Sequence, residues 1–486
     1  MTAEARAVSG SLAADTDADA SRSPGLRLPP PRISALLVLV FLGFGVLLGN
    51  VAGSRTDTLA AGSPLRLVLP QARTGTSVTP TTPASSESEP PASEAESTPA
   101  PAASQATSTP AATTTTSSER GEGGSSAENS QAAVGAPATK LPPIKHVFLI
   151  TLSSESYASV FGPASTASYI SQTLEKRGEL LVRYDAVAHE ELANGVALLS
   201  GQGPTVETAA DCPTYTDIAP AAPAASGQVT GSGCVYPAST QTLPGQLASH
   251  RLTWRAYVQG IGEGGGQPGA CAHPATGAAD PTAAAGASTG AYATFRNPLV
   301  YFHSITDSPA CAADDVGLAR LKADLASANS TPTLSYVVPD RCHDGNPTPC
   351  NPGAPAGMGP ADAFMRSVVP GILASKAYHE GGLLVVTVDQ APSGGEFGDS
   401  SSCCGQPRFP NLPPSSSGLT PRGGGTVGAL LISRWLKSGT TSQEPFNHFS
   451  LLRSIEDLFK LPHLGYAGLT GVKAFEPSMF TARPTG

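Results

Sequence analysis

The feature that most constrains the fold is a regular alternation of apolar runs with segments of helical spacing. Five runs have the length and β-branched content of strands: KHVFLITL (145–152), LLVRYDAVA (180–188), TLSYVVPD (333–340), LLVVTVDQ (383–390) and VGALLIS (427–433). Helical patterns cover residues 169–180, 364–382 and 449–459, and residues 242–260 suggest a helix followed by a strand. This alternation predicts an α/β fold with a largely parallel sheet, and the uninterrupted apolar runs predict helices on both faces.

Polar residues follow several of these runs, where α/β sheets form their ligand sites. The groups expected at that edge are Ser153 and Ser154, His189 to Glu191, His343 and Asp344, Asp389 and Gln390, and His448. Of these, His343, Asp344, Asp389 and His448 are a suitable ligand set for a divalent metal, which would polarise an ester or phosphoryl oxygen. Each also has a structural interpretation, because Asp344 suits a turn, Asp389 suits a strand end, and His448 suits the first turn of a helix capped by Asn447.

The N-terminal part of the chain has a different character. Residues 33–52 contain no charge and are long enough to cross a bilayer as a helix, with Arg27 and Arg32 on the side expected to stay in the cytoplasm. We therefore predict a cytoplasmic tail (1–32), a transmembrane signal anchor (33–53), a disordered Ser/Thr/Pro/Ala-rich stalk (54–141) and one folded domain (142–486). A cleaved signal peptide, and hence a secreted protein, is the alternative. Either way the domain is exported.

The cysteines and the charge agree with an exported domain that does not bind nucleic acid. All eight cysteines lie beyond residue 211, and an even number outside the cytoplasm indicates disulfides, with a zinc site as the alternative. Pairing of nearest neighbours gives Cys212–Cys234, Cys271–Cys311 and Cys342–Cys350 and leaves the adjacent Cys403 and Cys404, but the sequence does not fix the pairing. The net charge of -9 argues against nucleic acid as a partner.

Five blocks of the domain, in order, resemble the bacterial phosphoesterase family, which includes phospholipase C-type enzymes and acid phosphatases of the alkaline phosphatase superfamily. They are IKHVFLITLSSESYASVFG, YDAVAHEELANGVALLSGQ, YVVPDRCHDG, VVPGILASKAYHEGGLLVVTVDQ and NHFSLLRSIEDLF. The resemblance spans about residues 144–465. It implies a metal-assisted hydrolase of phosphate esters, with a phosphate ester or phospholipid head group as substrate and the membrane as a partner through residues 33–53.

The resemblance also assigns roles to single positions. It implies catalytic positions at His189, Glu191 and His343, substrate-binding positions at Ser153, Ser154 and Asn194, and metal-ligating positions at Asp344, Asp389 and His448. Four positions, in three motifs, depart from the family pattern. Ser153-Ser154 stands in place of Glu-Asn, Glu191 in place of the Ser or Thr nucleophile, and Gln390 in place of Glu.

These departures leave the role of Glu191 and the activity open. Glu191 could form an acyl phosphate, ligate a cation, or pair with Arg183 or His189, and Ser153, Ser154 or Ser156 could be a relocated nucleophile. Two functions follow. The first is an exported, membrane-anchored phosphoesterase with altered metal chemistry. The second is an inactive phosphoesterase-like domain that works as a binding or cell-envelope structural module.

Overall fold

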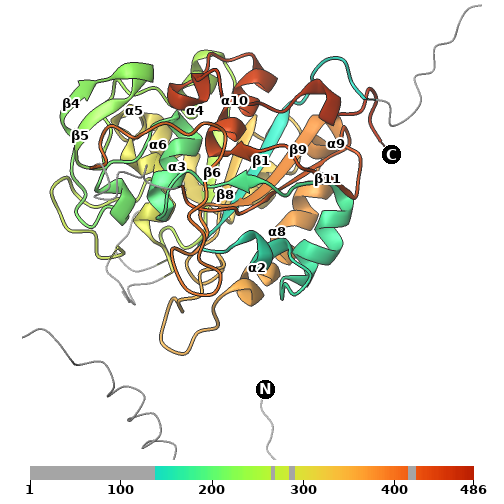
Figure 1. The fold of residues 1–486 in the computed structure, drawn as a ribbon, viewed down its shortest axis with the longest axis horizontal. Helices are drawn as coiled ribbons and strands as arrows, with labels where there is room; N and C mark the ends of the chain where they lie inside the picture. Colours follow the sequence, from blue (N-terminus) through green and yellow to red (C-terminus); the bar gives the residue numbers. More distant parts are fainter. Residues whose placement is uncertain (1–136, 264–268, 284–290, 414–422, 486) are drawn as a thin grey trace, which may run out of the picture. The chain divides into compact units, whose positions relative to one another are not determined.

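The structure is a computed structural model, and it describes residues 137–263, 269–283, 291–413 and 423–485 (Figure 1). The predicted cytoplasmic tail, the membrane anchor and the stalk up to residue 136 lie outside the described residues. Within the described ranges, no helix has both the length and the apolar character needed to span a bilayer.

The domain is built on an eight-stranded mixed sheet in the order β11-β2-β10-β9-β1-β8-β6-β7. Five adjacent strands are parallel: β9 (Gly382–Val388), β1 (His146–Leu152), β8 (Leu334–Val338), β6 (Trp254–Val258) and β7 (Asp315–Gly317). On the other side of β9, β10 (Ala429–Ser433) runs antiparallel to both β9 and β2 (Glu179–Leu181), and β11 (Thr440–Ser442) closes that edge. The predicted α/β class with a mostly parallel sheet is confirmed, and β10 makes the sheet mixed.

Two predicted elements differ from the structure. The run 180–188 is divided between β2 and the two-residue strand β3 (Tyr184–Asp185), which pairs with β12 (Phe446–Asn447) outside the main sheet. The predicted helix 169–180 is instead a π-helical turn, Tyr169–Leu174, and a 3-10 turn, Glu175–Arg177, and its last two residues belong to β2. The carboxylate of Asp362 accepts the N–H groups of Tyr169 and Ile170, so a tertiary contact fixes the start of this segment.

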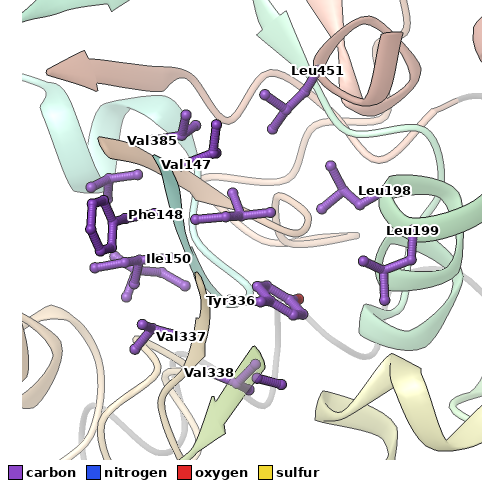
Figure 2. Close-up of a cluster of buried hydrophobic side chains, with 14 of the residues drawn as sticks. Val147, Phe148, Ile150, Leu198, Leu199, Tyr336, Val337, Val338, Val385 and Leu451 are labelled. Atoms are coloured by element: carbon purple, nitrogen blue, oxygen red, sulfur yellow. The ribbon is translucent and has the colours of Figure 1, made fainter. Parts of the chain in front are cut away.

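The core lies on both faces of β1. Every residue of β1 and of β9 is buried, as expected for strands covered on both sides. Figure 2 shows Phe148 and Ile150 on one side of β1 and, on the other, Leu198 of helix α3 (Glu191–Ser200) with Leu451 of α10 (His448–Phe459). Helix α9 (Lys376–Gly381) packs against β9 and β1, and α8 (Met358–Ala374) packs against α9 (Figure 1).

The eight cysteines form four disulfides. They join Cys212 to Cys234, Cys271 to Cys311, Cys342 to Cys350, and Cys403 to its neighbour Cys404. The disulfide interpretation of the cysteines is therefore confirmed, and pairing follows the nearest neighbour in the sequence throughout. The bridge at Cys342 lies in the segment that carries Asp344, which restricts that loop beside the strand ends.

Candidate functional site

The carboxyl ends of β1, β8 and β9 meet at one edge, and hydrogen bonds tie together the segments that leave them. The N–H of Ser153, just after β1, donates to the carbonyl of Asp344 at 2.8 Å. The N–H of Asp389, just after β9, donates to the carbonyl of Leu152 at 2.9 Å. Helix α3 begins at Glu191, and its first side chain reaches the same place. The structure therefore brings Ser153, Glu191, Asp344 and Asp389 together.

The centre of this edge is a buried arginine from a different part of the chain. Arg296 ends the 3-10 turn Thr294–Arg296, and only 3% of its side chain is exposed. Its Nη1 lies 2.6 Å from Asp389 Oδ2 and 3.2 Å from Glu191 Oε2, and its Nε lies 3.5 Å from Asp344 Oδ2. Nη2 donates to the carbonyl of Thr151 at 3.1 Å. One guanidinium is thus shared by three carboxylates and a strand-end carbonyl, an arrangement we call the Arg296 cluster.

The charges of the Arg296 cluster are strongly coupled. Burial raises the pKa of Asp344 to about 7, with Arg296 opposing and Glu191 adding to the rise. Burial and the charge of Glu191 likewise raise the pKa of Asp389 well above its usual range, despite Arg296. Burial alone would lower the pKa of the Arg296 guanidinium, but Glu191, Asp344 and Asp389 together raise it. Arg296 is therefore a permanent cation in a site that carries an excess of carboxyl groups.

Ser153 fixes the second oxygen of Glu191. The Ser153 hydroxyl donates to Glu191 Oε1 at 2.5 Å, while Arg296 holds Oε2. Ser154 lies beside it with a φ of 53°, a backbone region that L-residues rarely occupy. Its N–H donates to Asp389 Oδ1 at 3.2 Å, and its hydroxyl lies 3.1 Å from that of Ser153. Both oxygens of Glu191 are thus held, and within the described ranges its ion-pair partner is Arg296 rather than Arg183 or His189.

A second acidic pair lies next to the start of α3. Asp211 accepts the N–H of Leu192 at 2.9 Å, and Glu190 precedes the helix with a φ of 69°. Burial, reinforced by the charge of Glu191, raises the pKa of Asp211 well above its usual range and that of Glu190 to a smaller extent. The acidic excess therefore extends beyond the three carboxylates that contact Arg296.

His448 lies at the same edge with both ring nitrogens engaged. Nε2 lies 2.8 Å from the carbonyl of Asp389, so it carries the proton, and Nδ1 then accepts from the hydroxyl of Tyr184 at 2.9 Å. Burial lowers the pKa of His448 to about 4, so the ring is neutral at pH 7. In this arrangement no lone pair of His448 is left for a metal ion. Asn447 caps α10 through the N–H of Ser450, as the sequence suggested.

The other expected site residues make local contacts. His343 bonds through Nδ1 to Asp340 at 2.7 Å and is partly exposed. His189 contacts the hydroxyl of Ser400 at 2.8 Å. The Asn194 side chain accepts the N–H groups of Val187 and Ala188 and donates to the carbonyls of Ala188 and Glu190. Asn194 therefore shapes the turn that leads into α3, and none of these contacts joins the three residues to the Arg296 cluster.

The donor set does not fit a divalent metal. A metal at this edge would need carboxylates and a histidine nitrogen with free lone pairs, but the guanidinium of Arg296 lies among Glu191, Asp344 and Asp389. In the described part of the chain, no group of three or more His, Cys, Asp or Glu side chains is arranged to hold a metal ion. Arg296 supplies a positive charge where a metal-dependent site would have a cation.

Two members of this site escape sequence reasoning. Arg296 lies in TFRNPLVYF, an otherwise apolar and aromatic run in which an arginine is unusual, and that is the available signal. Asp211 lies next to a cysteine in a loop, with no pattern to mark it. Arg296 lies 105 residues from Glu191 in the sequence, so only tertiary packing brings the two together. Asp211 reaches the start of α3 because the loop after that helix folds back onto it.

Comparison with known proteins identifies the family. The model of the phosphoesterase family matches residues 149–462, more than half of the chain. No match was found among curated proteins.

Solved structures that resemble this chain include a protein of the alkaline phosphatase superfamily from Vibrio parahaemolyticus (12% identity, TM-score 0.36, covering 72% of this chain and 73% of that one). A second is the lipoteichoic acid synthase LtaP from Listeria monocytogenes, with 8% identity and a TM-score of 0.36, covering 71% of this chain and 80% of that one. A third is a sulfatase from Pseudoalteromonas sp., with 10% identity and a TM-score of 0.36, covering 70% of this chain and 73% of that one. On the family match, the chain belongs to the phosphoesterase family, a family of hydrolases that act on ester bonds.

Proposed function

We propose that residues 142–486 form an exported, membrane-anchored phosphoesterase-family domain that binds a ligand instead of hydrolysing phosphate esters. The observation that carries this proposal is the Arg296 cluster, in which one buried guanidinium is held by Glu191, Asp344 and Asp389. The cluster lies where the resemblance implies the nucleophile and the metal.

Two requirements of metal-assisted ester hydrolysis are unmet in this arrangement. The reaction needs a nucleophile, and both oxygens of Glu191 are held by Ser153 and Arg296. It also needs positive charge that can act on the phosphoryl oxygens, and the charge of Arg296 is already shared among three carboxylates. An incoming phosphate would have to compete with all three.

A phosphoesterase with altered chemistry is the second candidate. The family match favours it, and so does the contact of 2.5 Å between the Ser153 hydroxyl and Glu191, because a carboxylate can accept the proton of a hydroxyl nucleophile. This candidate requires Arg296 to leave the carboxylates when substrate binds.

The proposed location is the cell membrane, with the domain outside the cytoplasm. The uncharged residues 33–52, preceded by Arg27 and Arg32, support a single-pass anchor, and four disulfides suit an oxidising compartment. Release after cleavage of a signal peptide remains the alternative. Membrane fractionation, followed by protease treatment of intact cells, distinguishes the two.

The decisive experiment measures metal content and turnover on the full-length protein in lipid nanodiscs. We expect no stoichiometric divalent metal and no hydrolysis of p-nitrophenyl phosphate or p-nitrophenyl phosphorylcholine by a well-folded protein. Metal-dependent turnover that is lost in Glu191→Ala would refute the proposal in favour of the second candidate. Turnover that survives Glu191→Ala would also refute it, and would locate the chemistry at another residue.

A further inference from the structure

A pocket of about 420 Å³ opens beside Ser154 at the carboxyl end of β1. Three segments form its walls: residues 154–166 with helix α2 (Tyr157–Phe161), the loop that leads into α8, and the loop after β9. Helices α2 and α8 are neighbours in Figure 1. We propose that this pocket binds an amphiphile with an ammonium head group and a short apolar chain. This inference rests on the proposed function, in which the domain binds a ligand.

The walls favour an apolar chain. The lining residues away from Ser154 include Ala158, Pro163, Pro347, Met358, Pro392 and Phe397. Phe397 is 51% exposed, and in the described ranges only it and Val206 are large hydrophobic residues with exposed side chains. An alkyl chain in the pocket would cover the Phe397 ring and remove apolar surface from water, at about 25 cal/mol for each Å².

The inner end of the pocket offers acceptors. Ser153 donates its one hydroxyl proton to Glu191, so Ser154 must be the donor in the contact between the two serine hydroxyls. Ser154 therefore has no proton left for a ligand. The side-chain amides of Asn346 and Gln390 lie 3.3 and 3.4 Å from Ser154 Oγ, which are long hydrogen bonds. A ligand donor can therefore compete with them for the lone pairs of Ser154 Oγ.

Glu155 adds a carboxylate to the same end. Its side chain lines the pocket, and only 9% of the residue is exposed. Burial raises the pKa of Glu155, which a hydrogen bond from Ser159 opposes, and none of the ion pairs among the described residues includes Glu155. A buried carboxylate without a cation is costly, and a ligand cation would remove that cost. The head group that fits this end must therefore donate hydrogen bonds.

The charges decide between a neutral and a charged donor. No Lys, Arg or His lines the described walls of the pocket. Behind Ser154, the charge of Arg296 is engaged by Asp389 at 2.6 Å and by Glu191 at 3.2 Å, so it does not face the pocket unpaired. Glu155 is the one ionisable side chain on the described walls, so the inner end attracts a cation and repels a phosphate, sulfate or carboxylate head group. A primary ammonium satisfies both the acceptors and the field.

The test uses three probes that share a hexyl chain: hexylammonium, hexanol and hexyl phosphate. Binding to full-length protein in nanodiscs is measured by calorimetry, with empty nanodiscs as the blank. We expect hexylammonium to bind about tenfold more tightly than hexanol, with hexyl phosphate weakest. Tightest binding by hexyl phosphate, or no binding of hexylammonium to folded protein, would overturn the proposal.

Variants separate the head-group site from the walls. Glu155→Gln should weaken hexylammonium about tenfold and leave hexanol within about twofold. Phe397→Ala, at an exposed position, should weaken both probes alike, whereas Val206→Ala, equally exposed but not part of the pocket wall, should change neither. Unchanged hexylammonium affinity in Glu155→Gln would overturn the proposal. Hydrolysis of p-nitrophenyl phosphate would refute the proposed function instead, so the two failures are distinguishable.

Discussion

Replacing Arg296 by methionine is the sharpest test of the Arg296 cluster. The change removes the cation but keeps much of the side-chain volume, leaving Glu191, Asp344 and Asp389 buried without a partner. Breaking a buried ion pair by removing one member costs about 3–5 kcal/mol. Because the Arg296 side chain is 3% exposed and serves three carboxylates, we expect Arg296→Met to lower the free energy of unfolding by about that amount.

Urea unfolding of residues 142–486 expressed alone, followed by circular dichroism, measures this loss. Arg255→Met is the matched control, since Arg255 also bridges two carboxylates, Asp314 and Asp324, but its side chain is 19% exposed. Asp324 keeps Arg320 and Tyr257 as partners when Arg255 is removed. We therefore expect a loss of about 1 kcal/mol in the control.

The loss in Arg296→Met should also depend on pH. Without the cation, the carboxyl groups of the Arg296 cluster can avoid their buried charge by taking up protons, which becomes easier as the pH falls. The destabilisation should therefore be smaller at pH 5 than at pH 7. A loss in Arg296→Met no larger than that of the control, or one independent of pH, would refute the ion-pair account of the site.

Three further outcomes are expected. Burial holds the pKa of Asp344 above its unfolded value, so its contribution to stability is full below about pH 4 and is lost as the pH rises towards 7. Between pH 4 and pH 7 the free energy of unfolding of Asp344→Asn should therefore rise relative to that of the wild type. Parallel pH profiles for the two proteins would contradict this. Ser153→Ala should lower the free energy of unfolding by about 1–2 kcal/mol, because it removes the hydrogen-bond donor to buried Glu191. Ser154→Ala should cost less, because the hydroxyl contacts of Ser154 are longer. Urea titration of both variants tests this, and a larger loss in Ser154→Ala would count against it. Asn194→Ala should cost about 2–4 kcal/mol by the same measurement, because four backbone groups lose their partner, and a near-neutral change would show that the turn before α3 does not need it.

The class of fold was predictable because each strand carries its own signal. The runs that became β1, β8, β9 and β10 are mostly apolar, and every residue of these strands is buried, as expected for strands covered on both faces. The prediction weakened where burial depends on distant partners. The run 180–188 is apolar enough for one strand, yet pairing with β10 and with β12 divides it between two sheets.

The candidate site was predictable in place but not in composition. The rule that ligand sites lie at the carboxyl ends of parallel strands identified Ser153, Ser154, Asp344 and Asp389. It also placed His343 there, which the structure pairs with Asp340 instead. No periodic pattern pointed to Arg296, since its role depends on where a 3-10 turn packs against three other segments.

The sequence by itself determined the family, the α/β class with its central apolar strands, and the anomaly of a carboxylate at the nucleophile turn, because these are properties of local runs and motifs. Only the tertiary structure decided what Glu191 contacts. The Glu191 carboxylate could have ligated a bound cation or formed an ion pair with Arg183 or His189, and the local sequence is equally compatible with each. Packing brings Arg296 to within 3.2 Å of Glu191 and 2.6 Å of Asp389. The physical reason is that an ion pair between residues 105 positions apart is selected by burial and shape, which no local pattern encodes.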